Sequence, residues 1–135
     1  MKTEAFGSIQ SGKKATLYIL ENKKHAVVKV TDFGATLVSV LFADKDGVMK
    51  DMVLGYDDAA SYEKGTSCFG ATIGRNGNRI KDARFTIDGK EWVIEANENN
   101  NSLHSGKNGF NHLMWEMKES GDNYVTFYHY SPQEE

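Results

Sequence analysis

The sequence predicts an all-β protein, an antiparallel β-sandwich made of many short strands. Stretches rich in β-branched and aromatic residues recur along the chain, and turn-forming Asp, Asn and Gly residues separate them. Only one short stretch is suited to a helix. A parallel βαβ fold needs a helix between successive strands, so this pattern favours a sandwich.

In the first half of the chain we expect four strands and one helix. Thr16–Glu21, Ala26–Thr31, Thr36–Phe42 and Lys50–Leu54 are the predicted strands. The polar residues Asn22–Lys24 join the first two strands into a hairpin, and Asp44–Gly47 is a turn before the fourth. Asp57–Glu63 is the predicted helix, of one or two turns.

The second half predicts two further hairpins. Arg84–Asp88 and Glu91–Ile94 meet at the turn Asp88-Gly89, with Phe85, Ile87, Trp92 and Ile94 as a shared apolar set. Met114–Lys118 and Tyr124–Tyr130 flank the turn Ser120–Asn123. The last strand is aromatic on both faces, so we expect another segment, a second chain or a second copy to cover it.

Composition narrows the class of protein. With 135 residues, 39% of them hydrophobic, we expect one domain over residues 1–135. A net charge of −3 without a basic stripe disfavours nucleic acid, and the absence of a long apolar run or leader pattern favours a cytoplasmic protein that does not enter a membrane. One cysteine excludes an internal disulfide, and four scattered histidines disfavour a metal site.

Two polar loops hold the candidate site. Asn101–Phe110 carries His104 among glycines and amides, and Gly70–Ile80 ends in Asn78 and Arg79. The second loop lacks the order of glycines and the lysine of a phosphate loop, which excludes a nucleotide site of that kind. Asn78 and Arg79 offer directed hydrogen bonds suited to sugar hydroxyls, although an ion pair that ties down the loop explains Arg79 equally well.

Several of these strings, in this order, resemble the N-terminal part of the aldose 1-epimerase (galactose mutarotase) family. They are Phe33–Leu37, Asp44–Gly47, Val53–Tyr56, Gly74–Ile80, Phe85–Glu91, Asn101–Gly106 and Gly109-Phe110 ahead of Trp115. The resemblance implies a β-sandwich of the galactose mutarotase type. It also implies interconversion of the α and β anomers of aldohexoses such as glucose and galactose, with no cofactor and no metal.

The resemblance also implies roles for single residues. Asn78 and Arg79 match the substrate-binding pair of the family, and His104 matches a catalytic histidine that also contacts substrate. The chain departs from the family at Ser105, where a glycine is usual, and at Asn111, where an aspartate is common. The family's remaining acid and base residues lie beyond the region matched here, so we expect half a site that a second chain or the C-terminal part completes.

Two alternatives to the enzyme remain open at this point. The chain could be a non-catalytic carbohydrate-binding module that uses Asn78, Arg79 and His104, or a truncated structural paralogue that oligomerises through its open sheet edge. A phosphorylated sugar also remains possible as the ligand, because Arg75 and Arg79 suit a phosphate as well as hydroxyls.

Overall fold

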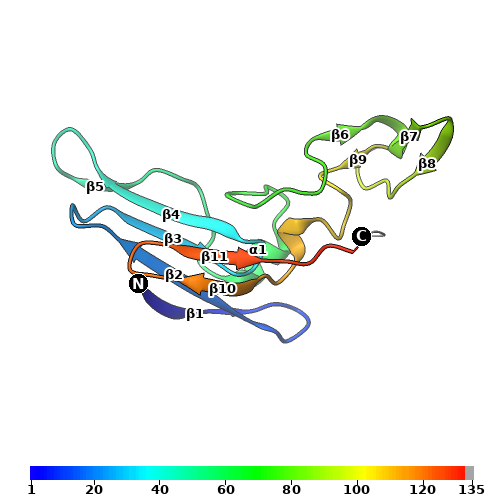
Figure 1. Ribbon diagram of the computed structural model, residues 1–135. Coiled ribbons are helices and arrows are strands. Elements are labelled where there is room, and N and C mark those ends of the chain that lie inside the picture. The colour runs from blue at the N-terminus through cyan, green and yellow to red at the C-terminus, as the bar shows by residue number, and fades with distance from the viewer. Residues whose placement is uncertain (133–135) are drawn as a thin grey trace.

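The structure is a computed structural model, and it describes residues 1–132. Its main element is a five-stranded antiparallel sheet in which the strands follow one another in chain order (Figure 1). The strands are β1 (Lys2–Ser8), β2 (Lys14–Glu21), β3 (Val27–Thr31), β4 (Thr36–Ala43) and β5 (Met49–Asp51). The prediction of an all-β, antiparallel protein with little helix is therefore confirmed.

The β2, β3 and β4 strands were predicted within two residues of their observed ends. Short polar side chains close the turns between them: Asn22 Oδ1 accepts the backbone N–H of Lys24 at 2.8 Å and of Ala26 at 3.1 Å. Asp44 Oδ1 accepts from Val48 at 3.0 Å in the turn before β5. Asn and Asp favour turns because their side chains can bond the backbone a few residues further on.

The β5 strand is shorter than the predicted Lys50–Leu54. Its last residue, Asp51, accepts the backbone N–H of Val40 at 3.0 Å and of Val53 at 3.2 Å through Oδ1. The Asp51 side chain thus accepts a backbone N–H of β4, and the pairing ends with the hydrogen bond from the Met52 N–H to the Val40 carbonyl at 2.8 Å. The β1 strand was not predicted because Phe6 is its only buried residue.

The core lies where one face of the sheet meets the helix α1 (Ala59–Lys64) and the loops around it. Phe33, 1% exposed, is the largest fully buried side chain. The other members of the cluster are Phe6, Ala15, Leu17, Val38, Ala59 and Tyr62. The rings of Phe6 and Tyr62 lie 6.0 Å apart, which ties the edge strand β1 to the helix.

The predicted helix is confirmed, and Asp58 caps its N-terminus. Asp58 Oδ1 accepts the backbone N–H of Ser61 at 2.7 Å, and this hydrogen bond lowers the pKa of the carboxyl. A helix of six residues has few internal hydrogen bonds, so it depends on its cap and on the burial of Ala59 and Tyr62.

Replacement of Asp58 by alanine removes this cap. We expect the thermal unfolding midpoint to fall by about 4 °C. Asp57→Ala, one residue earlier and with the same change of charge, should shift the midpoint far less. Calorimetry of both variants checks the assignment, and equal shifts would contradict it.

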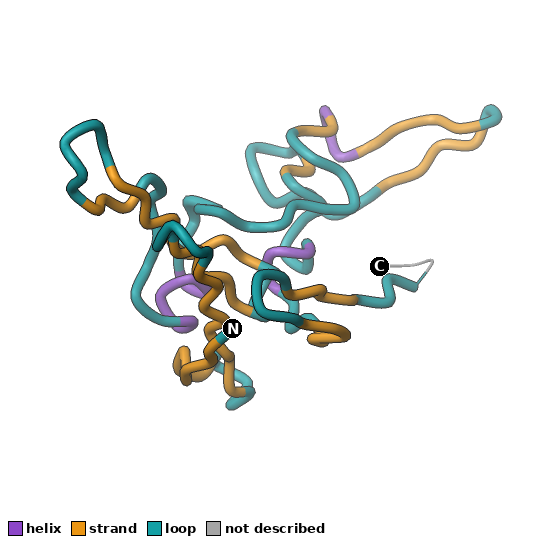
Figure 2. The backbone as a smooth tube through the Cα atoms, turned by 60° about the vertical axis from the view of Figure 1, so that its left-hand side comes forward, coloured by secondary structure: helices purple, strands orange, loops and turns teal. Residues whose placement is uncertain are grey.

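A hairpin of β10 (Glu116–Ser120) and β11 (Val125–Tyr128) forms a second layer across the sheet (Figures 1 and 2). The Tyr18 and Phe127 rings meet edge to face at 5.3 Å, and Phe33 forms a β-bridge with Met114 at the start of this segment. Both strands are shorter than or displaced from the predicted Met114–Lys118 and Tyr124–Tyr130. One face of β11 is packed through Phe127, whereas Tyr128 on the other face is exposed.

Residues 75–109 form an arm that extends away from the sheet (Figures 1 and 2). Its elements are β6 (Arg79–Ile80), the 3-10 turn η1 (Lys81–Ala83), β7 (Arg84–Ile87), β8 (Lys90–Val93) and β9 (Ser102–Leu103). The 3-10 turn η2 (Phe110–His112) follows the arm and lies against the sheet, where the Gly34 N–H donates to the Leu113 carbonyl at 2.7 Å. The predicted hairpin turn is confirmed, with positive φ at Asp88 and Gly89. The Phe85 and Trp92 side chains share a face, but Trp92 and Ile87 are exposed.

Candidate functional site

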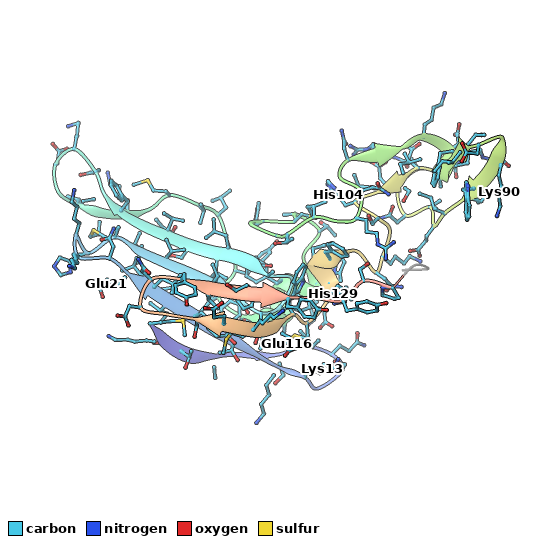
Figure 3. The ribbon with its side chains drawn as sticks, viewed as in Figure 1. Lys13, Glu21, Lys90, His104, Glu116 and His129 are labelled. Carbon is cyan, nitrogen blue, oxygen red and sulfur yellow. The ribbon has the colours of Figure 1, made fainter. Side chains whose placement is uncertain are left out.

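The antiparallel pairing of β6 with β9 brings the three predicted site residues together. Arg79 lies opposite Leu103 in this ladder, so the preceding Asn78 faces the following His104. The backbone N–H of His104 donates to the Asn78 carbonyl at 2.9 Å, and the backbone N–H of Asn78 donates to His104 Nδ1 at 3.1 Å. Figure 3 shows His104 at the base of the arm, beside β6 and β9.

The hydrogen bond from Asn78 fixes the form of the imidazole. A ring nitrogen that accepts a backbone N–H carries no proton, so in the neutral ring the proton lies on Nε2. His104 therefore presents an N–H donor at Nε2. Protonation of Nδ1 would break the bond to Asn78.

The backbone around the histidine explains how serine replaces a glycine here. His104, Ser105 and Gly106 have φ values of 54°, 69° and 82°, a run of left-handed residues. Such a conformation is costly for a residue with a Cβ atom. The Ser105 hydroxyl offsets part of this cost, because Oγ accepts the backbone N–H of Asn76 at 2.7 Å and lies 3.2 Å from its carbonyl as a donor.

Arg79 forms the ion pair that was the structural alternative for this residue. Its Nε lies 3.2 and 3.1 Å from the two carboxylate oxygens of Glu98, and Nη2 lies 2.8 Å from Oε1. Nη1 donates to Asn78 Oδ1 at 3.2 Å. The pairing raises the pKa of Arg79 and lowers the pKa of Glu98, in both cases chiefly through their side-chain hydrogen bonds.

Arg75 serves a different segment. Its Nε donates to Ser131 Oγ at 2.7 Å, and Nη2 contacts the Pro132 carbonyl, so this side chain ties the loop before β6 to the end of the described chain. These contacts give Arg75 a structural role. Arg75 and Arg79 therefore each have partners of their own.

The glutamates of the arm are also engaged. Glu95 Oε2 accepts the backbone N–H of Lys107 at 2.8 Å, and Glu91 lies 3.8 Å from Arg84. Glu98 is held by Arg79. Each of these carboxylates therefore has a partner within the arm.

A cavity of about 390 Å³ lies beside the site and is distinct from it. Ser105 and Phe110 are on its wall, together with Gly74, Arg75, Asn76, Val93, Ile94, Glu95, Ser102 and Asn108. The Phe110 ring packs edge to face on Trp115 at 5.6 Å and on His129 at 5.7 Å. Asn78, Arg79 and His104 do not line this cavity.

Within residues 1–132, no group of three His, Cys, Asp or Glu side chains is arranged to hold a metal ion. No helix in the same range is long and apolar enough to cross a membrane. The residues that sequence analysis missed at the site are Asn97, which bonds Leu103, and Glu98, which bonds Arg79.

Comparison with known proteins gives one consistent family. A family model described as aldose 1-epimerase matches residues 16–135. Galactose mutarotase of Rattus norvegicus is 35% identical over 130 residues, which are 96% of this chain and 38% of the relative. Aldose 1-epimerase of Escherichia coli K12 is 34% identical over 86% of this chain and 34% of the relative.

Solved structures agree with this result. The fold is similar to the GalM/aldose epimerase homologue from C. elegans, with a TM-score of 0.80 and 34% identity over 84% of this chain and 35% of that one. Galactose 1-epimerase from Lactobacillus acidophilus matches with a TM-score of 0.73 and 28% identity, over 90% of this chain and 35% of that one. The chain thus spans little more than a third of the length of these relatives.

Proposed function

Because this chain belongs to the aldose 1-epimerase family, we propose that it takes part in the interconversion of the α and β anomers of aldohexoses such as galactose and glucose. We further propose that residues 1–135 are the N-terminal part of one mutarotase domain and supply the substrate-binding half of its site. The observation that carries the proposal is the direct pairing of Asn78 with His104, with Arg79 beside them. The expected cytoplasmic location stays a prediction.

The chemistry requires two proton transfers. A base removes the proton from the anomeric hydroxyl, an acid protonates the ring oxygen, the C1–O5 bond breaks, and the aldehyde rotates before the ring closes on its other face. With Nδ1 occupied by Asn78, His104 can donate an Nε2–H hydrogen bond to a sugar oxygen. Loss of that proton would leave an unfavourable imidazolate, so in this state His104 suits the stabilisation of a developing charge.

The base and any second acid are proposed to come from the part of the relatives that this chain does not cover. Glu91, Glu95 and Glu98 each have a partner in the arm, as described above, which supports an outside source. The covered length of 38% of the rat relative is consistent with it.

Exposed apolar side chains support a second chain, a further segment or self-association that completes the sheet. Phe42, Met49 and Leu54 around β5 are exposed, as are Tyr128 and Tyr130 around β11. Leu54 and Tyr130 are each 72% exposed. Monomeric proteins rarely leave several large apolar side chains in water along open strands.

A non-catalytic carbohydrate-binding module is the second candidate. It is favoured by the same occupied glutamates, because sugar binding needs donors such as Arg79 and His104 but no free base. The two candidates differ in one result: the module binds galactose without changing its mutarotation.

Polarimetry of freshly dissolved α-D-galactose tests the proposed function. We expect the purified chain alone to add little to the spontaneous rate, and the chain co-purified with the C-terminal part of a related mutarotase to accelerate it strongly. The C-terminal part alone is the control. A complex that forms without acceleration would contradict the enzymatic role and favour the binding module, and acceleration by the chain alone would contradict the half-site.

A further inference from the structure

The segment Asn97–Asn101, here called the 97–101 turn, contacts both sides of the site. The backbone N–H of Asn101 donates to the Glu98 carbonyl at 2.8 Å, and Asn99 and Asn100 between them have positive φ values of 46° and 67°. Two left-handed residues in succession are typical of tight hairpin turns, and Asn tolerates that conformation better than other residues with a side chain. The three consecutive asparagines therefore specify this turn.

The turn holds Arg79 through Glu98. The Arg79 guanidinium has five N–H donors. Nε and Nη2 are directed at the Glu98 carboxylate, and Nη1 bonds Asn78 Oδ1. These contacts use three donors and leave two, one on each terminal nitrogen. Arg79 can thus bind hydroxyl oxygens with its terminal nitrogens while its orientation is fixed.

The same turn holds the backbone that leads into the histidine. Asn97 Nδ2 donates to the Leu103 carbonyl at 2.9 Å, and the Leu103 N–H donates to Asn97 Oδ1 at 2.7 Å. The amide of Asn97 therefore satisfies both backbone groups of the residue before His104. Asn101 Oδ1 accepts the Asp82 N–H at 3.1 Å, which anchors the turn to the segment after β6.

We propose that the 97–101 turn is the positioning element of the sugar site, in which Asn97 fixes the approach to His104 and Glu98 both orients Arg79 and selects for uncharged sugars. This inference rests on the proposed function. A carboxylate 2.8 Å from Nη2 cancels the charge of Arg79 and repels an added anion, whereas hydroxyl oxygens need only the two remaining N–H donors. Glu98 is thus a positioning and specificity residue.

The experiment uses Glu98→Gln, which removes the charge and keeps the size, and Glu91→Gln as a matched control at another ion pair of the arm. The chain is titrated with D-galactose and, separately, with galactose 6-phosphate, and the amide resonances of Asn78 and His104 and the Arg79 Nε–Hε resonance are followed by NMR. The complex of this chain with the C-terminal part of a related mutarotase, here called the complemented enzyme, gives the KM for galactose and the inhibition constant of galactose 6-phosphate.

In Glu98→Gln we expect weaker galactose binding and a shift of about tenfold in relative affinity toward the phosphorylated sugar. Glu91→Gln should match the unmodified chain. Unchanged affinities for both sugars in Glu98→Gln would overturn the inference while leaving the proposed function intact. An unmodified chain whose three site resonances do not respond to galactose, and whose complex has no activity, would overturn the proposed function and the role of Glu98 with it.

A second variant covers a failure of Glu98→Gln to fold. Glu98→Asp keeps the charge and shortens the side chain by one methylene. We expect weaker galactose binding without a gain for galactose 6-phosphate. A gain for the phosphate in Glu98→Asp would contradict the electrostatic part of the inference.

Discussion

Replacing His104 by alanine is expected to lower kcat for galactose mutarotation in the complemented enzyme by about 100- to 10,000-fold. The substitution removes the Nε2–H donor, and it also removes the Nδ1 acceptor that holds the Asn78 backbone. The measurement is the initial rate of optical rotation at saturating galactose, with spontaneous mutarotation subtracted.

Two further variants separate the possible causes of that loss. His104→Gln places an amide N–H near the position of Nε2, so it should retain more activity than His104→Ala if the histidine acts as a hydrogen-bond donor. His25→Ala is the control, since this histidine is exposed in the turn between β2 and β3 and its imidazole bonds Glu21, far from the site. Unchanged turnover in His104→Ala would contradict its role.

Replacing Gly34 by alanine is expected to lower the free energy of unfolding by roughly 2 to 5 kcal/mol. Gly34 has a φ of 68°, and a Cβ atom there would lie 2.6 Å from the Asn111 carbonyl oxygen and 2.8 Å from Thr36 Oγ1. The backbone of η2 packs directly on this glycine, so the collision cannot be relieved by a side-chain rotation alone. Urea titration followed by fluorescence gives the change.

Gly47→Ala is the matched control for Gly34→Ala. Gly47 also has a positive φ, 78°, but a Cβ atom there would meet nothing within 4 Å. It should therefore cost only the strain of the left-handed backbone, about 1 to 2 kcal/mol. Equal losses in the two variants would show that the contact with Asn111 contributes nothing.

The parts of the fold that could be predicted are those whose local sequence is typical of a strand or a turn. The β2, β3 and β4 strands are rich in β-branched and aromatic residues, and Asp88-Gly89 marks its hairpin by turn chemistry alone. In contrast, β6 and β9 have two residues each and exist only because they pair with each other. The β1 strand has a mostly polar sequence with no clear strand pattern, and it is a strand because its backbone pairs with β2.

Part of the candidate site could also be predicted from the sequence. The resemblance to a family identified Asn78, Arg79 and His104, and their roles stay predictions, while the structure shows that they lie together. The sequence could not assign Glu98 to Arg79, because the two are 19 residues apart and become neighbours only through the pairing of β6 with β9. The asparagine run was a usable signal of a tight turn, although it did not reveal which side chains that turn would hold.

The arm that carries the site buries few of its side chains. Ala83 and Ser102 are buried within it, but its strands β7 and β8 are largely in contact with water on both faces. Segments with so little burial open by local unfolding at a much lower free energy than the sheet around Phe33. Amide hydrogens of the arm should therefore exchange with solvent well before those of β2 and β3, and a bound sugar that bridges Arg79 and His104 would slow that exchange.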